Sequence, residues 1–137
     1  MNADDISIAV GVHLPEDVVR ARQAGRDAAR ALGLGLADQT RLATAISEIA
    51  RNALRYGGGG TCEIKGSQDG RYREIQVTVT DTGPGIPDVN QAMMPGFSTG
   101  NSLGMGLPGA RRLVDAMDVV SRPGFTQVIL VMRRRSQ

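Results

Sequence analysis

The chain has 137 residues, of which 41% are hydrophobic and only 3% aromatic, and its formal net charge is +2. This length predicts a single domain, residues 1–137, that buries about two-thirds of the unfolded surface around an aliphatic core. The sequence contains no apolar run near the ~20 residues that span a bilayer, no secretory signal and one cysteine, Cys62. We therefore expect a cytoplasmic protein without membrane contacts or a disulfide.

Arginine supplies nearly all the positive charge, and only Arg133, Arg134 and Arg135 form a basic run. Three basic residues predict a solvated end of the chain, because a nucleic-acid footprint needs a larger cluster on one face. Few aromatic side chains are available to stack on bases. Nucleic acid is therefore not expected as a partner.

Alternating apolar residues from Ile6 to Val12 predict a first strand. Pro15 and the two acids after it favour the start of a helix, because proline suits the first turn and acids suit its positive end. Gly33 ends this helix. The only histidine, His13, is expected to be an ordinary residue at the end of the strand.

A second helix is predicted over residues 36–56, with Asp38 as its N-terminal cap. The four consecutive glycines from Gly57 to Gly60 end it. Its apolar stripe has helical spacing and consists of Leu42, Ile46, Ile49 and Ala53.

Two further strands, residues 61–66 and 72–80, are separated by Asp69-Gly70 and predict an antiparallel hairpin. A long loop follows, with a short helix around residues 89–94, and then a third helix over 107–117. Strands over 119–121 and 126–132 close the chain. This order predicts an α/β two-layer sandwich with helices on one face of a mixed sheet.

Glu48 and Asn52 lie four residues apart in the second helix, so they share one face. An amide oxygen at Asn52 suits Mg²⁺, which takes one or two protein ligands in addition to water and phosphate oxygens. Glu48 is placed to act as a general base one turn away. An ordinary solvated pair is the alternative interpretation of these two residues.

Asp81 follows a run of β-branched residues and precedes Gly83 and Gly85. An ionised aspartate accepts a hydrogen bond from the exocyclic amine of adenine, and glycines allow backbone to approach a flat base. The same residues are also common in a tight turn, which is the alternative.

Residues 96–106 are rich in glycine and hydroxyl side chains and lead into a helix. The N-terminus of a helix presents unpaired N–H groups that suit phosphate, and Ser98 and Thr99 supply further donors. Residues 104–109 match the pattern of a dinucleotide-binding loop. The strand before it and the acid about 20 residues later are both missing, so we reject that interpretation.

These motifs, in this order, resemble the superfamily of gyrase, heat-shock chaperone, histidine kinase and mismatch-repair ATPases, known as GHKL. Within it, the stretches 44–52, 96–100 and 103–115 look like the small bacterial serine/threonine switch kinases of stressosome and partner-switching systems. The resemblance runs from Ile6 to Met132. It implies a Bergerat-type ATPase fold with a mixed, mostly antiparallel sheet.

The resemblance also implies roles for individual residues. Glu48 would be the catalytic base and Asn52 the Mg²⁺ ligand. In such kinases a glycine directly precedes the threonine near the adenine, whereas Phe125 separates Gly124 from Thr126 here. The implied ATP contacts are Asn52, Asp81, Gly83, Gly85, Ile86, Ser98, Thr99, Gly104, Met105, Gly106, Leu107 and Thr126.

By the same resemblance, the chain is an Mg·ATP-dependent kinase that phosphorylates a STAS-domain antagonist or scaffold protein. Once released, it would bind and activate a PP2C-type phosphatase. One alternative is an anti-sigma factor that sequesters a sigma factor, and another is an ATP-binding module without activity. The Glu-Ile-Ala-Arg-Asn form of the helix motif, residues 48–52, favours the switch kinase.

Overall fold

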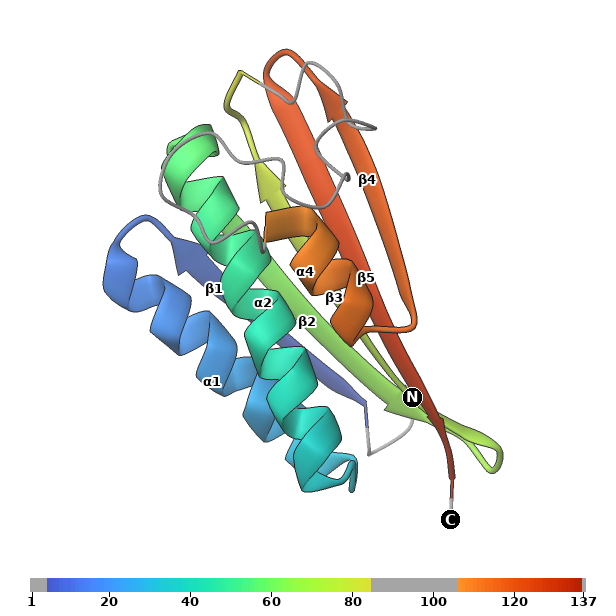
Figure 1. The fold of residues 1–137 in the computed structure, drawn as a ribbon. Helices are drawn as coiled ribbons and strands as arrows, with labels where there is room; N and C mark the ends of the chain where they lie inside the picture. The colour runs from blue at the N-terminus through green and yellow to red at the C-terminus, as the bar shows by residue number, and fades with distance from the viewer. Residues whose placement is uncertain (1–4, 85–105, 137) are drawn as a thin grey trace.

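The computed structural model describes residues 5–84 and 106–136. Two helices follow the first strand, a hairpin comes next, and a short helix precedes the last two strands (Figure 1). In chain order the elements are β1 (Ile6–Val12), α1 (Pro15–Ala31), α2 (Leu36–Gly57), β2 (Gly60–Gln68), β3 (Tyr72–Asp81), α4 (Gly106–Leu113), β4 (Ala116–Arg122) and β5 (Phe125–Arg135).

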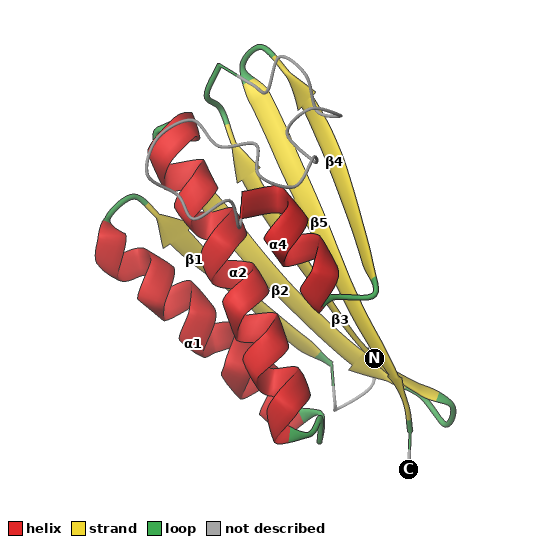
Figure 2. Cartoon of the chain, in the orientation of Figure 1, coloured by secondary structure: helices red, strands yellow, loops and turns green. Residues whose placement is uncertain are grey.

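The strands form one sheet in the order β1-β2-β3-β5-β4, and the helices cover one of its faces (Figure 2). The predicted two-layer α/β sandwich is confirmed. The expected mixed sheet was wrong, since all four strand pairs of the described chain are antiparallel. Two helices, α1 and α2, connect β1 to β2, and the chain reverses direction three times between these strands, so β2 runs antiparallel to β1.

The core lies between the helices and the inner face of the sheet. The predicted stripe of α2 is buried, with Leu42 and Ile46 fully inaccessible to solvent. In β3, every second residue from Ile75 onward is buried, so this side of the strand faces the core. Helices α1 and α2 approach closely at Gly25, where a Cβ atom would collide with the side chain of Ile46. This close packing fixes the position of α2, the helix that carries Glu48, relative to α1.

Asp38 does not cap α2, contrary to the sequence-based expectation. Gly35 is the N-cap residue, and the Asp38 carboxylate instead accepts hydrogen bonds from Arg134 Nε at 2.9 Å and Arg41 Nη1 at 2.9 Å. Arg134 also donates to Asp115 at 2.8 Å. The basic run lies in β5: Arg133 and Arg135 are exposed, as expected, whereas Arg134 is half-buried and ties this strand to the start of α2.

The third predicted helix is shorter than expected. Helix α4 ends at Leu113, and residues 116–122 form β4 instead of a last helical turn. The backbone N–H of Asp115 donates to Val131 O at 3.0 Å, which draws the chain into the sheet at this point. The short helix expected around residues 89–94 lies outside the described residues.

Candidate nucleotide site

Helix α2 places Glu48 and Asn52 on one side of the fold, next to the start of α4. Glu48 Oε1 accepts a hydrogen bond from Arg51 Nη1 at 3.1 Å, and the Glu48 side chain is 15% exposed to solvent. A Cβ atom on Gly106 would lie 3.8 Å from Asn52 Nδ2, so the backbone that opens α4 lies beside this amide. The first and third sequence motifs therefore meet at Asn52.

Asp81 and Thr126 form the second part of the site. They are direct partners in the β3–β5 register, at the end of the sheet nearest the C-terminal end of α2. Both side chains are buried, with exposures of 9% for Asp81 and 6% for Thr126. The hydroxyls of Thr126 and Ser121 lie 2.7 Å apart and share a hydrogen bond. A buried carboxyl and a buried hydroxyl thus lie side by side at the strand ends.

Glycines bring this second part against α2. A Cβ atom on Gly57, the last residue of α2, would lie 2.6 Å from Asp81 Oδ1. The Gly83 N–H donates to Asp81 Oδ1 at 3.0 Å, and the Gly124 N–H donates to Gly83 O at 2.9 Å. The end of α2 therefore meets Asp81 at the end of β3, and the β4–β5 turn joins them through Gly83.

Alanine at Gly83 is expected to lower the free energy of unfolding by about 1–3 kcal/mol, the usual effect of overpacking. The new Cβ atom would lie 2.9 Å from Gly57 O, and backbone atoms cannot move aside as a flexible side chain does. Gly70 is a matched control, because its Cβ position is open space. Urea unfolding of Gly83→Ala and Gly70→Ala measures the difference, and equal stabilities would refute the close approach.

Burial raises the pKa of the Asp81 carboxyl, and the hydrogen bond from the Gly83 N–H lowers it to a smaller extent. A raised pKa means that the folded state holds this proton more tightly than the unfolded state. The stabilisation from this group is thus complete below the unfolded pKa and is lost as the pH rises through the folded pKa.

Asp81→Asn removes this titration while keeping an oxygen for the Gly83 N–H. We expect the variant to gain stability relative to the wild type as the pH rises from about 4 to about 7. Urea unfolding of both proteins across this range measures the trend. If the wild type instead gains stability relative to Asp81→Asn as the pH rises, the folded site stabilises the ionised carboxylate.

Phe125 does not displace Thr126. Pro123 and Gly124 form the turn between β4 and β5, where Gly124 has a φ of 84°, and Phe125 is paired with Arg122 at the first position of the hairpin. The Arg122 guanidinium stacks over the Phe125 ring at 4.3 Å, so this ring has its own partner. The extra residue thus leaves Thr126 in register with Asp81.

The remaining predicted contacts fall into two groups. Gly106 and Leu107 open α4; the Leu107 side chain is 5% exposed and packs in the core, so only its backbone is available to a ligand. The others lie outside the described residues: Gly85, Ile86, Ser98, Thr99, Gly104 and Met105.

Sequence reasoning missed Gly57 and Ser121. Gly57 was interpreted only as the end of a helix, although a glycine there is also what allows Asp81 to approach. Ser121 carries no motif of its own. Its partnership with Thr126 arises from the β4–β5 register, which pairs the two residues directly.

The residues around Asn52 fit a hard cation. The described chain has no group of three or more His, Cys, Asp or Glu side chains that would hold a metal without further ligands. Mg²⁺ does not need such a group, because it keeps several waters and takes one or two protein oxygens with phosphate. The Asn52 amide, whose Nδ2 lies 3.8 Å from the Cβ position of Gly106, would supply one such oxygen.

A comparison with protein families matches residues 37–135 to the histidine kinase-, DNA gyrase B- and HSP90-like ATPases. The chain belongs to this ATPase family. The match starts in α2 and ends in β5, and so includes every element that contributes to the site described above. ATP is the nucleotide that this family implies.

Among individual relatives, the serine/threonine-protein kinase RsbT of Bacillus subtilis is 46% identical over 108 residues, which cover 79% of this chain and 81% of RsbT. The anti-sigma F factor of Pasteuria penetrans is 30% identical over 105 residues, covering 72% of this chain and 70% of that protein. These findings confirm the predicted family and the predicted class, a protein kinase of partner-switching type.

Among solved structures, the RsbU and RsbW domains of a Mycobacterium tuberculosis protein align with a TM-score of 0.64 and 20% identity, over 97% of this chain and 33% of that one. At this identity the likeness confirms the fold alone. No helix among the described residues is long and apolar enough to cross a membrane.

Proposed function

We propose that this protein is a cytoplasmic, Mg·ATP-dependent serine/threonine kinase whose substrate is a STAS-domain antagonist or scaffold protein. In this proposal, the kinase released from its substrate binds and activates a PP2C-type phosphatase. The kinase class rests on the 46% identity to RsbT. The identity of the substrate and of the phosphatase is an inference from the resemblance of the motifs.

One observation carries the proposal: Glu48 and Asn52 share a face of α2, and Gly106 lies beside Asn52. Phosphoryl transfer needs positioning and charge stabilisation more than covalent chemistry by the protein. Glu48 would accept the proton of the attacking serine or threonine hydroxyl. The backbone N–H groups that open α4 would bind phosphate oxygens.

Asn52 would hold Mg²⁺, which when bound neutralises charge on the phosphate oxygens. Asp81 would accept a hydrogen bond from the adenine amine, and the hydroxyl of Thr126 would donate to Asp81 or to the base. The burial of Asp81 and its direct pairing with Thr126 support this role, because they place a carboxyl and a hydroxyl side by side at the ends of β3 and β5.

The test is incubation of the purified protein with Mg²⁺, radiolabelled ATP and a STAS-domain protein encoded beside it. We expect label on a serine or threonine of the STAS protein, identified by phosphoamino acid analysis. A STAS protein in which the acceptor is replaced by alanine is the control. Transfer to none of the co-encoded STAS proteins would refute the proposed substrate class.

The likeness to the anti-sigma F factor supports a second candidate, a kinase that also sequesters a sigma factor. The two functions differ in the partner that the unoccupied kinase binds. Binding of the purified chain to a co-encoded PP2C-type phosphatase, with a rise in phosphatase activity, supports the switch kinase. Tight binding to a sigma factor, with loss of transcription in vitro, supports the anti-sigma role.

A further inference from the structure

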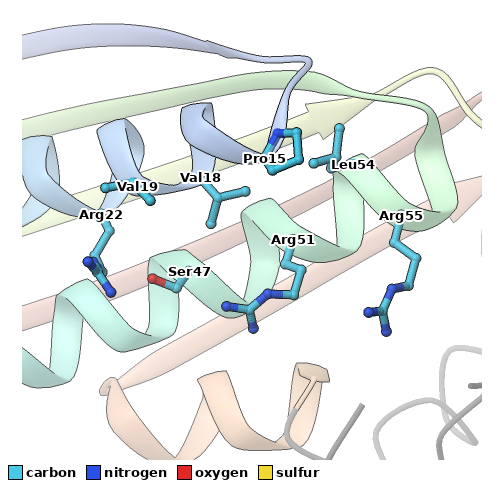
Figure 3. Close-up of a pocket in the computed structure, with 8 residues that line it drawn as sticks. All are labelled: Pro15, Val18, Val19, Arg22, Ser47, Arg51, Leu54 and Arg55. Carbon is cyan, nitrogen blue, oxygen red and sulfur yellow. The ribbon is translucent and has the colours of Figure 1, made fainter. Parts of the chain in front are cut away.

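A groove that the nucleotide site does not use lies between α1 and α2 on the outer surface of the helical layer (Figure 3). It encloses about 450 Å³. Its apolar walls come from the first turns of α1 and from the C-terminal half of α2, and consist of Pro15, Val18, Val19 and Leu54. We call this feature the α1–α2 groove.

Three arginines line the same groove: Arg22 of α1, and Arg51 and Arg55 of α2. Figure 3 shows their guanidinium groups on one side of the apolar walls. None of the eight lining residues is an acid. Arg51 is paired with Glu48, whereas within the described residues no acidic side chain forms an ion pair with Arg22 or Arg55.

Exposed apolar residues occur in the groove and beside its lining residues in the chain. Val19 in its wall is 53% exposed, and Leu14 and Tyr56, the chain neighbours of Pro15 and Arg55, are 55% and 43% exposed. These are three of the five large hydrophobic residues exposed in the described chain. Exposed apolar surface rimmed by polar residues marks sites that bind another protein, a membrane or a ligand.

We propose that the α1–α2 groove binds an acidic amphipathic helix of a partner protein. The apolar face of such a helix would lie against Val18, Val19 and Leu54, as in other helix-in-groove complexes. Its carboxylates would pair with Arg22 and Arg55. Charge complementarity selects this occupant, since Arg22 and Arg55 have no acidic ion-pair partner among the described residues and would attract carboxylates and repel a basic segment.

The groove is adjacent to the nucleotide site without being part of it. Arg51 lines the groove and donates to Glu48 at 3.1 Å, so it joins the bound helix to the proposed catalytic base. Changes at Arg51 would disturb both surfaces. Arg22 and Arg55 therefore serve as the test positions.

The experiment measures binding of a fluorescent peptide of about 16 residues, long enough to form a helix, with leucines on one face and glutamates on the other. The full-length protein is titrated by fluorescence anisotropy. Two peptides are controls: one with lysine in place of glutamate, and one of the same composition in scrambled order. The protein variants are Arg22→Glu/Arg55→Glu and, as a matched control, Arg71→Glu in the β2–β3 loop at the opposite end of the sheet.

We expect Arg22→Glu/Arg55→Glu to weaken binding of the acidic peptide by about tenfold or more, because each reversal replaces an attraction with a repulsion. Arg71→Glu should change it less than about twofold. Equal affinity of the wild type and the double variant would overturn the proposal, as would the absence of binding. If the wild type binds the scrambled peptide as tightly as the amphipathic one, the groove recognises charge alone, and this result would also overturn the proposal.

Two further readouts separate other outcomes. ATP affinity of the double variant should equal that of the wild type, which shows that it is folded and keeps this result independent of the kinase proposal. Sedimentation with vesicles of phosphatidylserine and phosphatidylcholine tests a lipid surface as the occupant. Vesicle binding that requires Arg22 and Arg55, without peptide binding, would replace the partner helix with a membrane and overturn the proposal.

Discussion

Asn52→Ala is expected to lower the affinity for Mg·ATP by at least the ~10–100-fold that loss of an outer-shell partner costs a metal site. Asn52 is the amide beside the backbone that opens α4, and alanine offers no oxygen there. ATP without Mg²⁺ should bind the wild type and the variant alike. Isothermal titration with and without Mg²⁺ measures both affinities.

Thr44→Ala is the matched control, because Thr44 is exposed on the same helix two turns before Asn52. It should bind Mg·ATP as the wild type does. The unfolding midpoints of both variants in urea show whether either loses its fold. A wild-type affinity of Asn52→Ala for Mg·ATP would remove Asn52 from the metal site.

Glu48→Gln should slow phosphoryl transfer by about 100- to 10,000-fold, the contribution of a general base, while ATP still binds. Glutamine keeps the size and an oxygen for Arg51 but cannot accept the proton of the substrate. Single-turnover transfer to the STAS protein measures the rate, and titration of ATP measures binding.

Two controls separate the roles of Glu48. Glu63→Gln removes an exposed carboxylate on β2 and should leave the rate unchanged. Arg51→Gln breaks the 3.1 Å ion pair but keeps the Glu48 carboxylate, so a loss of only a few fold is expected. If Glu48→Gln retains the wild-type rate, another group is the base. If Arg51→Gln is as slow as Glu48→Gln, the ion pair positions the carboxylate.

Most of the fold follows from local patterns in the sequence. Period-2 burial in β3 and the helical stripe of α2 are strong signals, because one face of each element must be buried. The predicted end of the third helix was wrong. The alternation of apolar and polar residues from Met117 to Ser121 is too short to indicate the strand that replaces the last helical turn. The sheet, through Asp115 and Val131, decides where that helix stops.

The sequence indicated the residues of the candidate site, but it did not indicate which of them contact one another. Glu48, Asn52 and Asp81 stand in motifs that the sequence displays. Asp81 and Thr126 lie 45 positions apart in the chain, and their pairing depends on the register of β3 and β5, for which the sequence holds no local signal. Likewise, the sequence suggested Asp38 as a cap, whereas the tertiary ion pair with Arg134 determines its role.

An NMR titration of the isotope-labelled protein with Mg·ATP shows whether residues from α2, β3, α4 and β5 form one ATP site. The largest changes in backbone amide shifts are expected at Asn52, Asp81, Gly83, Gly106 and Thr126. Arg22 and Val19 in the α1–α2 groove should change little. Large changes confined to the groove, or shifts at Asn52 without shifts at Asp81 and Thr126, would show that these elements do not form one ATP site.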